Sequence, residues 1–255
     1  MPSPDSKIRF TSRVDAYVRY RPTYPSAVID VLRDRGGLTP GSVVADVGSG
    51  TGISTELLLK HAGTVYAVEP NAAMRGAAEG TLSKYPGFHS VDGSAEATML
   101  PDGSVELIVC AQAFHWFDPP RTRDEFRRIL RGGGGPVALI WNERKKDASD
   151  FLAGYESLLV RYSPDYSKVT QHRAVGEAGV ERFFGRPVKP VLLANEQRFD
   201  WPGLRGRLMS SSYVPTPGQP NHDELFAAMR ELFDRTQQGG TVAFEYDTEV
   251  YVGRL

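Results

Sequence analysis

The chain has one cysteine, Cys110, among its 255 residues. A single cysteine excludes a disulfide within the chain and any zinc or redox motif built on paired cysteines. We expect no metal site. Because Cys110 lies inside the apolar run VELIVC, it is best explained as a small buried hydrophobic residue.

An excess of charge of one sign is also missing, since 30 Lys and Arg residues stand against 31 Asp and Glu residues. We therefore expect no nucleic-acid partner. No apolar run approaches the roughly 18 residues of a membrane span, and the opening MPSPDSKIRF lacks the apolar core of a signal peptide. These absences predict a cytoplasmic protein without membrane contact. They leave its oligomeric state open between a monomer and a weak dimer.

The first half of the chain alternates strand-like and helix-like segments. Apolar runs predict strands over 42–48, 64–70, 88–93, 104–111 and 136–142. Cap residues and periodicity predict helices over 54–63, 71–85 and 119–131. Repeated strand–helix order with nearly continuous apolar strands predicts a Rossmann-like, doubly wound α/β fold with a mostly parallel sheet. Such sheets bind ligands beyond the carboxyl ends of their strands.

The second half predicts a helical cap beside that edge. Residues 147–162 and 222–237 have helical character, 188–201 are extended, and 242–252 alternate as a terminal strand. Residues 210–220 have the composition of a loop.

A glycine-rich turn follows the first strand, in the stretch VVADVGSGTG with glycines at 48, 50 and 52. Glycine lets the backbone turn with positive φ and approach a ligand closely. The spacing lacks the third glycine of a dinucleotide fingerprint, because Ile53 stands there, and it lacks the lysine of a phosphate loop. By itself it fits either a ligand-binding loop or a tight structural turn.

Glu69 ends the second strand, 17 residues after Gly52. A carboxylate there could accept two hydrogen bonds from a ribose diol, or it could be a solvated acid at a strand end. Met74 could cover a purine face or belong to the core.

Four segments, DVGSGTG, VEPNAAM, GSAEATMLPDGSVELIV and AQAFHWFD, occur in one order over residues 42–142. In motif, order and spacing this region resembles class I S-adenosylmethionine-dependent methyltransferases. The N-terminal FTSRVDAYVRYRPTYP and the His-Trp-Phe sequence are similar to the type 11 branch and to trans-aconitate methyltransferases. The resemblance implies about seven strands with the last one antiparallel. It divides one structural domain into an N-terminal helical segment over the cofactor site (1–40), a cofactor-binding core (41–142), and helical cap insertions with the final strands (143–255).

The resemblance also implies S-adenosyl-L-methionine as cofactor, with S-adenosyl-L-homocysteine as product. The glycine loop would lie under the methionine part and be oriented by Asp46, while Glu69 would hold the ribose. The residue at position 94 would meet the adenine edge, although many relatives have Asp there. The implied cofactor-binding residues are Tyr17, Arg21, Asp46, Gly48, Ser49, Gly50, Gly52, Glu69, Pro70, Asn71, Met74, Ser94, Ala95, Glu96, Gln112 and Ala113.

His115 lies three residues beyond Gln112, on the expected ligand edge. It could be a catalytic base, a residue that shapes the pocket, or a packing residue. Trp116 and Trp141 are candidate walls of the substrate pocket.

These features predict a methyltransferase that moves a methyl group by in-line displacement to an oxygen or nitrogen of a small molecule, with a carboxylate among the candidates. An NAD(P)-dependent oxidoreductase and a non-catalytic cofactor-binding protein are the alternatives. Four arginines could serve an acidic acceptor: Arg19, Arg21, Arg205 and Arg207.

Overall fold

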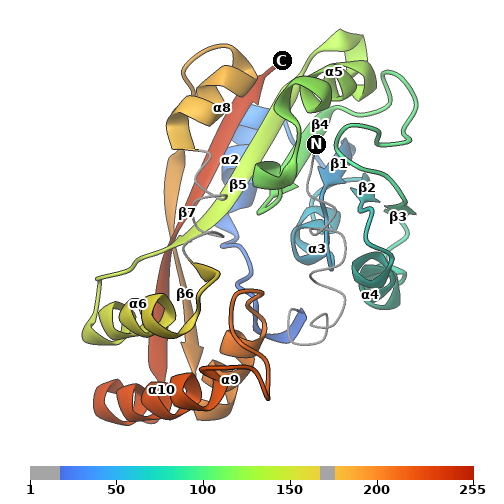
Figure 1. Cartoon of the computed structure of the whole chain (residues 1–255). Helices are drawn as coiled ribbons and strands as arrows, with labels where there is room; N and C mark the ends of the chain where they lie inside the picture. The colour runs from blue at the N-terminus through green and yellow to red at the C-terminus, as the bar shows by residue number, and fades with distance from the viewer. Residues whose placement is uncertain (1–17, 167–175) are drawn as a thin grey trace.

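The structure is a computed structural model that describes residues 18–166 and 176–255. Within these ranges, seven strands form one sheet in the order β3-β2-β1-β4-β5-β7-β6 (Figure 1). The strands are β1 (Val43–Val47), β2 (Thr64–Val68), β3 (Phe88–Val91), β4 (Leu107–Ala111), β5 (Pro136–Arg144), β6 (Val191–Phe199) and β7 (Val242–Arg254).

Strands β1 to β5 pair in parallel, whereas β7 is antiparallel to both of its neighbours, β5 and β6. This arrangement confirms the predicted Rossmann-like fold with an antiparallel last strand. Because the first five strands run the same way, their carboxyl ends meet at one edge of the sheet, where ligands bind in such folds.

Helices cover both faces of the sheet. The helices with bounds in the described part of the chain are α2 (Ala27–Gly36), α3 (Ile53–Leu59), α4 (Ala72–Leu82), α5 (Pro119–Ile129), α6 (Asp150–Tyr162), α8 (Gly176–Phe184), α9 (Trp201–Met209) and α10 (His222–Thr236), and 3-10 turns lie at η2 (Phe114–Trp116) and η3 (Arg131–Gly133).

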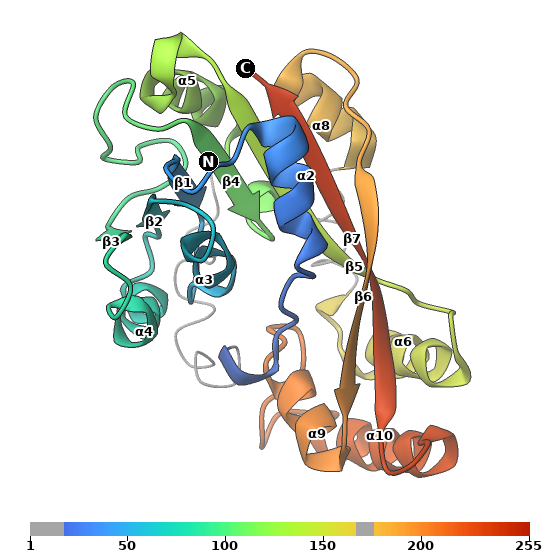
Figure 2. The same cartoon turned by 180° about the vertical axis from the view of Figure 1, so that it is seen from behind.

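The alternation along β4 shows how one strand serves two cores. Leu107 and Val109 pack with α2 and α3 on one face, while Ile108 and Cys110 pack with α5 and α8 on the other. Figure 2 shows α2 lying along the β5–β7 part of the first face. Cys110 is a free, buried thiol, as its apolar surroundings predicted.

The helix caps that lead into the site follow directly from the sequence. Asn71 Oδ1 accepts hydrogen bonds from the backbone amides of Ala73 and Met74 at the start of α4. Asp118 caps α5, whose first residue is Pro119. Both helices begin within one residue of the starts predicted at 71 and 119, and each cap fixes where its loop ends.

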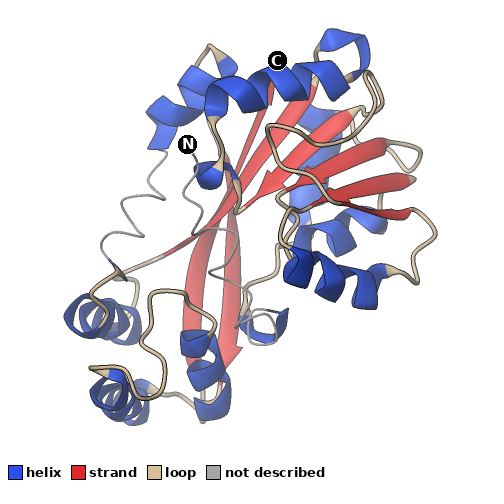
Figure 3. Ribbon diagram, turned by 45° about the vertical axis from the view of Figure 1, so that its right-hand side comes forward, coloured by secondary structure: helices blue, strands red, loops and turns tan. Residues whose placement is uncertain are grey.

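The helical cap is carried by a long antiparallel pair of strands, β6 and β7. Strands β6 and β7 continue past the parallel strands, and α6, α9 and α10 gather at their far end (Figure 3). Phe244 and Tyr246 of β7 pack there with Leu152, Leu208 and Met229 from these three helices. The sequence predicted a helical cap but did not predict α8 or α9. Among the described helices, none is both long and apolar enough to cross a membrane.

Candidate active site

A cavity of about 630 Å³ opens at the carboxyl edge of the parallel strands and continues to the cap. Its volume lies within the range typical of small-molecule sites. One end is formed by the glycine loop after β1 and by the ends of β2 and β4. The other end is formed by residues of β5, β7 and α9. A single cavity therefore joins the predicted cofactor region to the helical cap.

The three loop glycines all have positive φ, but they do different jobs. A Cβ on Gly48 would lie 2.5 Å from the Cβ of Ala113, and a Cβ on Gly52 would lie 2.6 Å from Leu82 Cδ1. These two positions permit close packing inside the protein. A Cβ on Gly50 would meet no protein atom closer than the sulfur of Met74, at 4.0 Å. Gly50 lines the cavity, so its missing side chain leaves space for a ligand.

Glu69 holds this loop from the neighbouring strand. Its Oε2 accepts a hydrogen bond from the amide of Gly50 at 3.0 Å, and its Oε1 accepts one from the amide of Asn71 at 2.8 Å. Burial raises the pKa of the Glu69 carboxyl, and the two amide donors oppose that rise. A carboxylate has about four lone-pair positions, so two remain for hydroxyl donors in the cavity.

Asp46 supports the loop from below and does not line the cavity. Its Oδ2 accepts hydrogen bonds from Ser54 Oγ at 2.7 Å and Thr55 Oγ1 at 2.6 Å, at the start of α3. Burial raises its pKa from 3.8 to about 6, although both hydroxyls lower it. The carboxyl joins the end of β1 to the helix that follows the loop, which fits the orienting role that the resemblance implied.

Gln112, just past β4, has a positive φ of 56°. A non-glycine residue in this region is uncommon and costs conformational energy, and such residues cluster at functional sites. Its side-chain amide donates to the carbonyl of Asn142 at 3.3 Å, which joins the ends of β4 and β5. Gln112 and Ala113 both line the cavity, as do Pro70, Asn71 and Met74.

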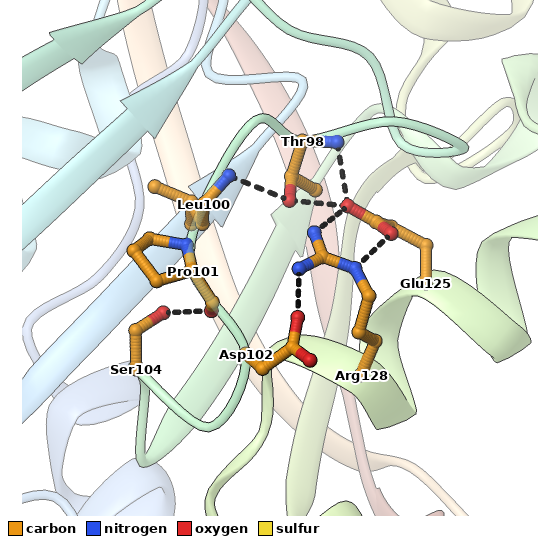
Figure 4. Close-up of polar contacts among 7 residues, drawn as sticks. All are labelled: Thr98, Leu100, Pro101, Asp102, Ser104, Glu125 and Arg128. Atoms are coloured by element: carbon orange, nitrogen blue, oxygen red, sulfur yellow. Dashed lines mark hydrogen bonds and ion pairs between the residues drawn. The ribbon is translucent and has the colours of Figure 1, made fainter.

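The segment predicted to meet the adenine edge, Ser94 to Glu96, does not line this cavity. Glu96 instead accepts a hydrogen bond from the amide of Asp118, the cap of α5. Figure 4 shows that the same loop is fastened to α5 further on, where Glu125 accepts from both the amide and the hydroxyl of Thr98. The loop is thus anchored beside the site.

The N-terminal segment reaches the cavity through Arg21, whose Nη2 donates to the carbonyl of Ser210 at 2.9 Å. The segment is held by Asn142 and Asn195, whose side-chain amides both donate to the carbonyl of Thr23. Tyr17, the other residue expected at the cofactor's carboxylate, lies outside the described residues.

The aromatic residues around His115 separate into two places. Trp116 and Trp141 line the main cavity, and the indole nitrogen of Trp141 is buried there without a hydrogen-bond partner. His115 is itself buried and lines a second cavity of about 640 Å³, between α5 and α8. The main cavity does not include it, so a catalytic role for His115 stays a prediction.

The cap contributes residues that the sequence did not indicate as site residues, apart from Arg207. Arg144 at the end of β5 and Tyr246 of β7 line the cavity, together with Tyr166, Arg207 and Tyr213. The rule that ligands meet the carboxyl ends of strands could have indicated Arg144, because it ends β5. No sequence signal placed α9 and β7 on the same cavity, because their meeting there depends on how the long β6–β7 strand pair is arranged in the fold.

Comparison with known proteins adds an independent line of evidence. Residues 45–137 match the family Methyltransf_11, described as a methyltransferase domain. An uncharacterised methyltransferase of Mycobacterium tuberculosis is 39% identical over 140 residues, which cover 55% of this chain and 54% of that protein. An uncharacterised methyltransferase-like protein of Schizosaccharomyces pombe is 32% identical over 157 residues, covering 61% of this chain and 59% of the relative. The matches thus span little more than half the length of these curated relatives.

Solved structures extend the likeness to the cap. A protein assigned as a type II methyltransferase from Anaeromyxobacter dehalogenans aligns over 92% of this chain and 98% of its own, with 27% identity and a TM-score of 0.68. A geranyl diphosphate C-methyltransferase from Streptomyces coelicolor, solved with S-adenosyl-L-homocysteine, shares the fold at 15% identity and a TM-score of 0.52, over 98% of both chains.

Residues 45–137 are thus similar to methyltransferase domains, and the fold of nearly the whole chain resembles that of a solved methyltransferase. Likeness to trans-aconitate methyltransferases is not shown.

Proposed function

We propose that this protein transfers a methyl group from S-adenosylmethionine to an oxygen or nitrogen atom of a small molecule bound in the cap end of the cavity. One observation carries the proposal: a single cavity runs from Gly50 and Glu69 to the helical cap. The residues at its first end fit the cofactor, since Gly50 leaves space above the loop and Glu69 keeps acceptor positions for a ribose diol. The buried hydroxyl of Thr51, which has no hydrogen-bond partner among the described residues, lines the same end.

When bound, the cofactor supplies an electrophilic methyl group that an acceptor lone pair can take by in-line displacement. The protein's own residues then have to align the two molecules and exclude water. Gln112 and Ala113 line the cavity just past the end of β4, and we propose that they border the sulfonium. Trp116 and Trp141 also line the cavity, and we propose that they form walls on the acceptor side. A carboxylate acceptor would need no general base, whereas a phenol or an alcohol would.

The test is transfer of a labelled methyl group from S-adenosylmethionine to a panel of small acceptors that contains carboxylates, phenols, alcohols and amines. We expect labelled product from at least one class, with S-adenosylhomocysteine formed in equal amount. Tight cofactor binding without transfer to any class would favour a non-catalytic cofactor-binding protein. Binding of NADH in place of S-adenosylhomocysteine would favour an oxidoreductase and contradict the proposal.

A further inference from the structure

Arg207 is a buried cation at the cap end of the cavity. Arg207 is only 6% exposed. Its guanidinium, on α9, lies over the ring of Phe244 of β7. The Nη1 atom donates to Ser211 Oγ at 3.0 Å, and Nε has no hydrogen-bond partner. Within the described residues, Arg207 forms no ion pair with any carboxylate. An arginine stays charged at every accessible pH, and a buried charge without a counter-ion is expensive to keep.

Two other cations near this end, Arg144 and Lys146, have a carboxylate partner. Arg144 Nη2 contacts Glu156 Oε2, and Lys146 Nζ lies 3.3 Å from Glu156 Oε1. Glu156 is therefore the partner of both cations. Burial raises the pKa of the Glu156 carboxyl, but hydrogen bonds from Tyr166 and Arg144 outweigh burial and lower that pKa. Arg207 differs from its neighbours because its charge has no such partner.

Acidic residues also line the cavity. One of them, Glu249, lies at a different position along β7 from Arg207. Glu249 accepts a hydrogen bond from Tyr251 and stands opposite Trp141 in the β5–β7 register, whereas Arg144 stands opposite Tyr246. The cation–π contact places Arg207 at Phe244, further still along β7. Glu143 and Glu177 line the cavity as well, and both contribute to raising the pKa of Tyr251. Along β7, Glu249 thus lies at the level of Trp141, whereas Arg207 lies toward the cap at Phe244 and has no carboxylate partner among the described residues.

We infer that the methyl acceptor is a small organic carboxylate and that Arg207 receives its carboxylate group. A guanidinium offers donors in a planar fork that matches a carboxylate, and their pairing in a water-poor cavity is strong. Tyr213 and Tyr246 line the same part of the cavity and supply hydroxyl and aromatic surface around the acceptor. Of the four arginines that the sequence offered for an acidic acceptor, Arg207 and Arg21 line the cavity, and Arg21 already donates to a backbone carbonyl. The inference rests on the proposed function, because it names the substrate class of that same site.

The test is calorimetric binding of acceptor probes to the protein saturated with S-adenosylhomocysteine. The probes are succinate, tricarballylate and benzoate, each compared with its primary amide and with an amine of similar size. We expect at least one carboxylate to bind at least tenfold more tightly than its amide. We expect Arg207→Met to weaken binding of that carboxylate by about 100-fold. The dissociation constant of S-adenosylhomocysteine should change by less than about threefold. Arg207→Lys should recover part of the loss.

The matched control is Arg205→Met, which makes the same change two residues away on the exposed side of α9. An equal effect of both substitutions would overturn the inference, as would equal or tighter binding of the amides or the amines. Failure of every carboxylate to bind protein that binds S-adenosylhomocysteine would also overturn it. If Arg207→Met does not fold, the wild-type comparison of carboxylates with their amides decides the matter. Failure of S-adenosylhomocysteine itself to bind would count against the proposed function instead.

Discussion

Glu69 combines two tasks that the sequence could not separate. It directly follows β2, one residue beyond the last residue of the strand, and its two oxygens fix the backbone at Gly50 and at Asn71. An acid that merely faced solvent at a strand end would make no such contacts. The carboxylate therefore shapes the loop and still offers acceptor positions toward the cavity.

Replacing Glu69 with glutamine tests both tasks. The amide group keeps one acceptor oxygen and turns a donor toward either Gly50 or Asn71, so the loop loses one of its two bonds. We expect Glu69→Gln to weaken S-adenosylhomocysteine binding by about 10- to 100-fold in calorimetry. Glu79→Gln, an exposed change on α4, is the control. Unchanged affinity in Glu69→Gln would show that the carboxylate is not a cofactor contact.

Asp46 should make the stability of the protein depend on pH. Its pKa is about 6 in the folded protein and close to 3.8 when exposed, because burial penalises the charged form. A raised pKa means that its contribution to stability is fully present below about pH 4 and is lost as the pH rises through about 6.

We therefore expect Asp46→Asn to gain stability relative to the wild type as the pH rises from 4 to 6, by on the order of 2–3 kcal/mol. Asparagine keeps an oxygen that can accept from Ser54 or Thr55, so the helix contact survives in part. Urea unfolding at several pH values measures the difference, with the exposed Asp34→Asn as control. Parallel stability curves for the wild type and Asp46→Asn over this range would contradict the assignment.

At the scale of elements, the connection from β3 to β4 is fixed by charge. Glu125 of α5 accepts from the amide of Thr98 at 2.7 Å and from its hydroxyl at 2.6 Å, and it pairs with Arg128, which also contacts Asp102 (Figure 4). Burial raises the pKa of Glu125, but the hydrogen bonds from Arg128 and Thr98 outweigh it and lower the pKa to about 2. These contacts hold the loop that carries Ser94 to Glu96 against α5.

We expect Glu125→Gln to destabilise the protein at pH 7 by about 1–2 kcal/mol and to speed exchange of the Thr98 amide hydrogen. A lowered pKa means that the stabilisation is present above about pH 4.5 and is lost as the pH falls through about 2. The difference between the two proteins should therefore shrink in acid. Hydrogen exchange at Thr98 that is the same in both proteins would show that the contact does not hold the loop.

At the scale of the whole molecule, local patterns predicted the parallel half well. The apolar runs located β1, β2, β4 and β5 to within a few residues, because those strands are buried on both faces. Asn71 and Asp118 located two helix starts because capping is a local contact.

The cap could be predicted only in outline. Residues 188–201 and 242–252 had the pattern of strands. Their pairing into a long antiparallel pair that extends past the parallel strands depends on tertiary contacts, which the local pattern does not contain. This strand pair brings α9 to the N-terminal segment. The two are so close that a Cβ on Gly206 would lie 2.1 Å from the ring of Tyr20. The strand pair also brings Arg207 to a cavity whose other end is the loop at Gly50. Contacts between residues this far apart in the chain have no local sequence signal, which is why most of the acceptor side was missed.

The proposed methyltransferase activity depends most directly on the loop at Gly50 being the cofactor site. Gly50 and Gly103 form a matched pair, with φ of 57° and 60° and no protein atom closer than 4.0 Å to an added Cβ at either position. Valine at either site carries similar backbone strain, but only Gly50 lines the cavity.

The decisive measurement is calorimetric titration of S-adenosylhomocysteine into the wild type, Gly50→Val and Gly103→Val. We expect one molecule bound per chain in the wild type and in Gly103→Val, and at least a 100-fold loss of affinity in Gly50→Val. No binding to the wild type, or equal binding to all three proteins, would contradict the account.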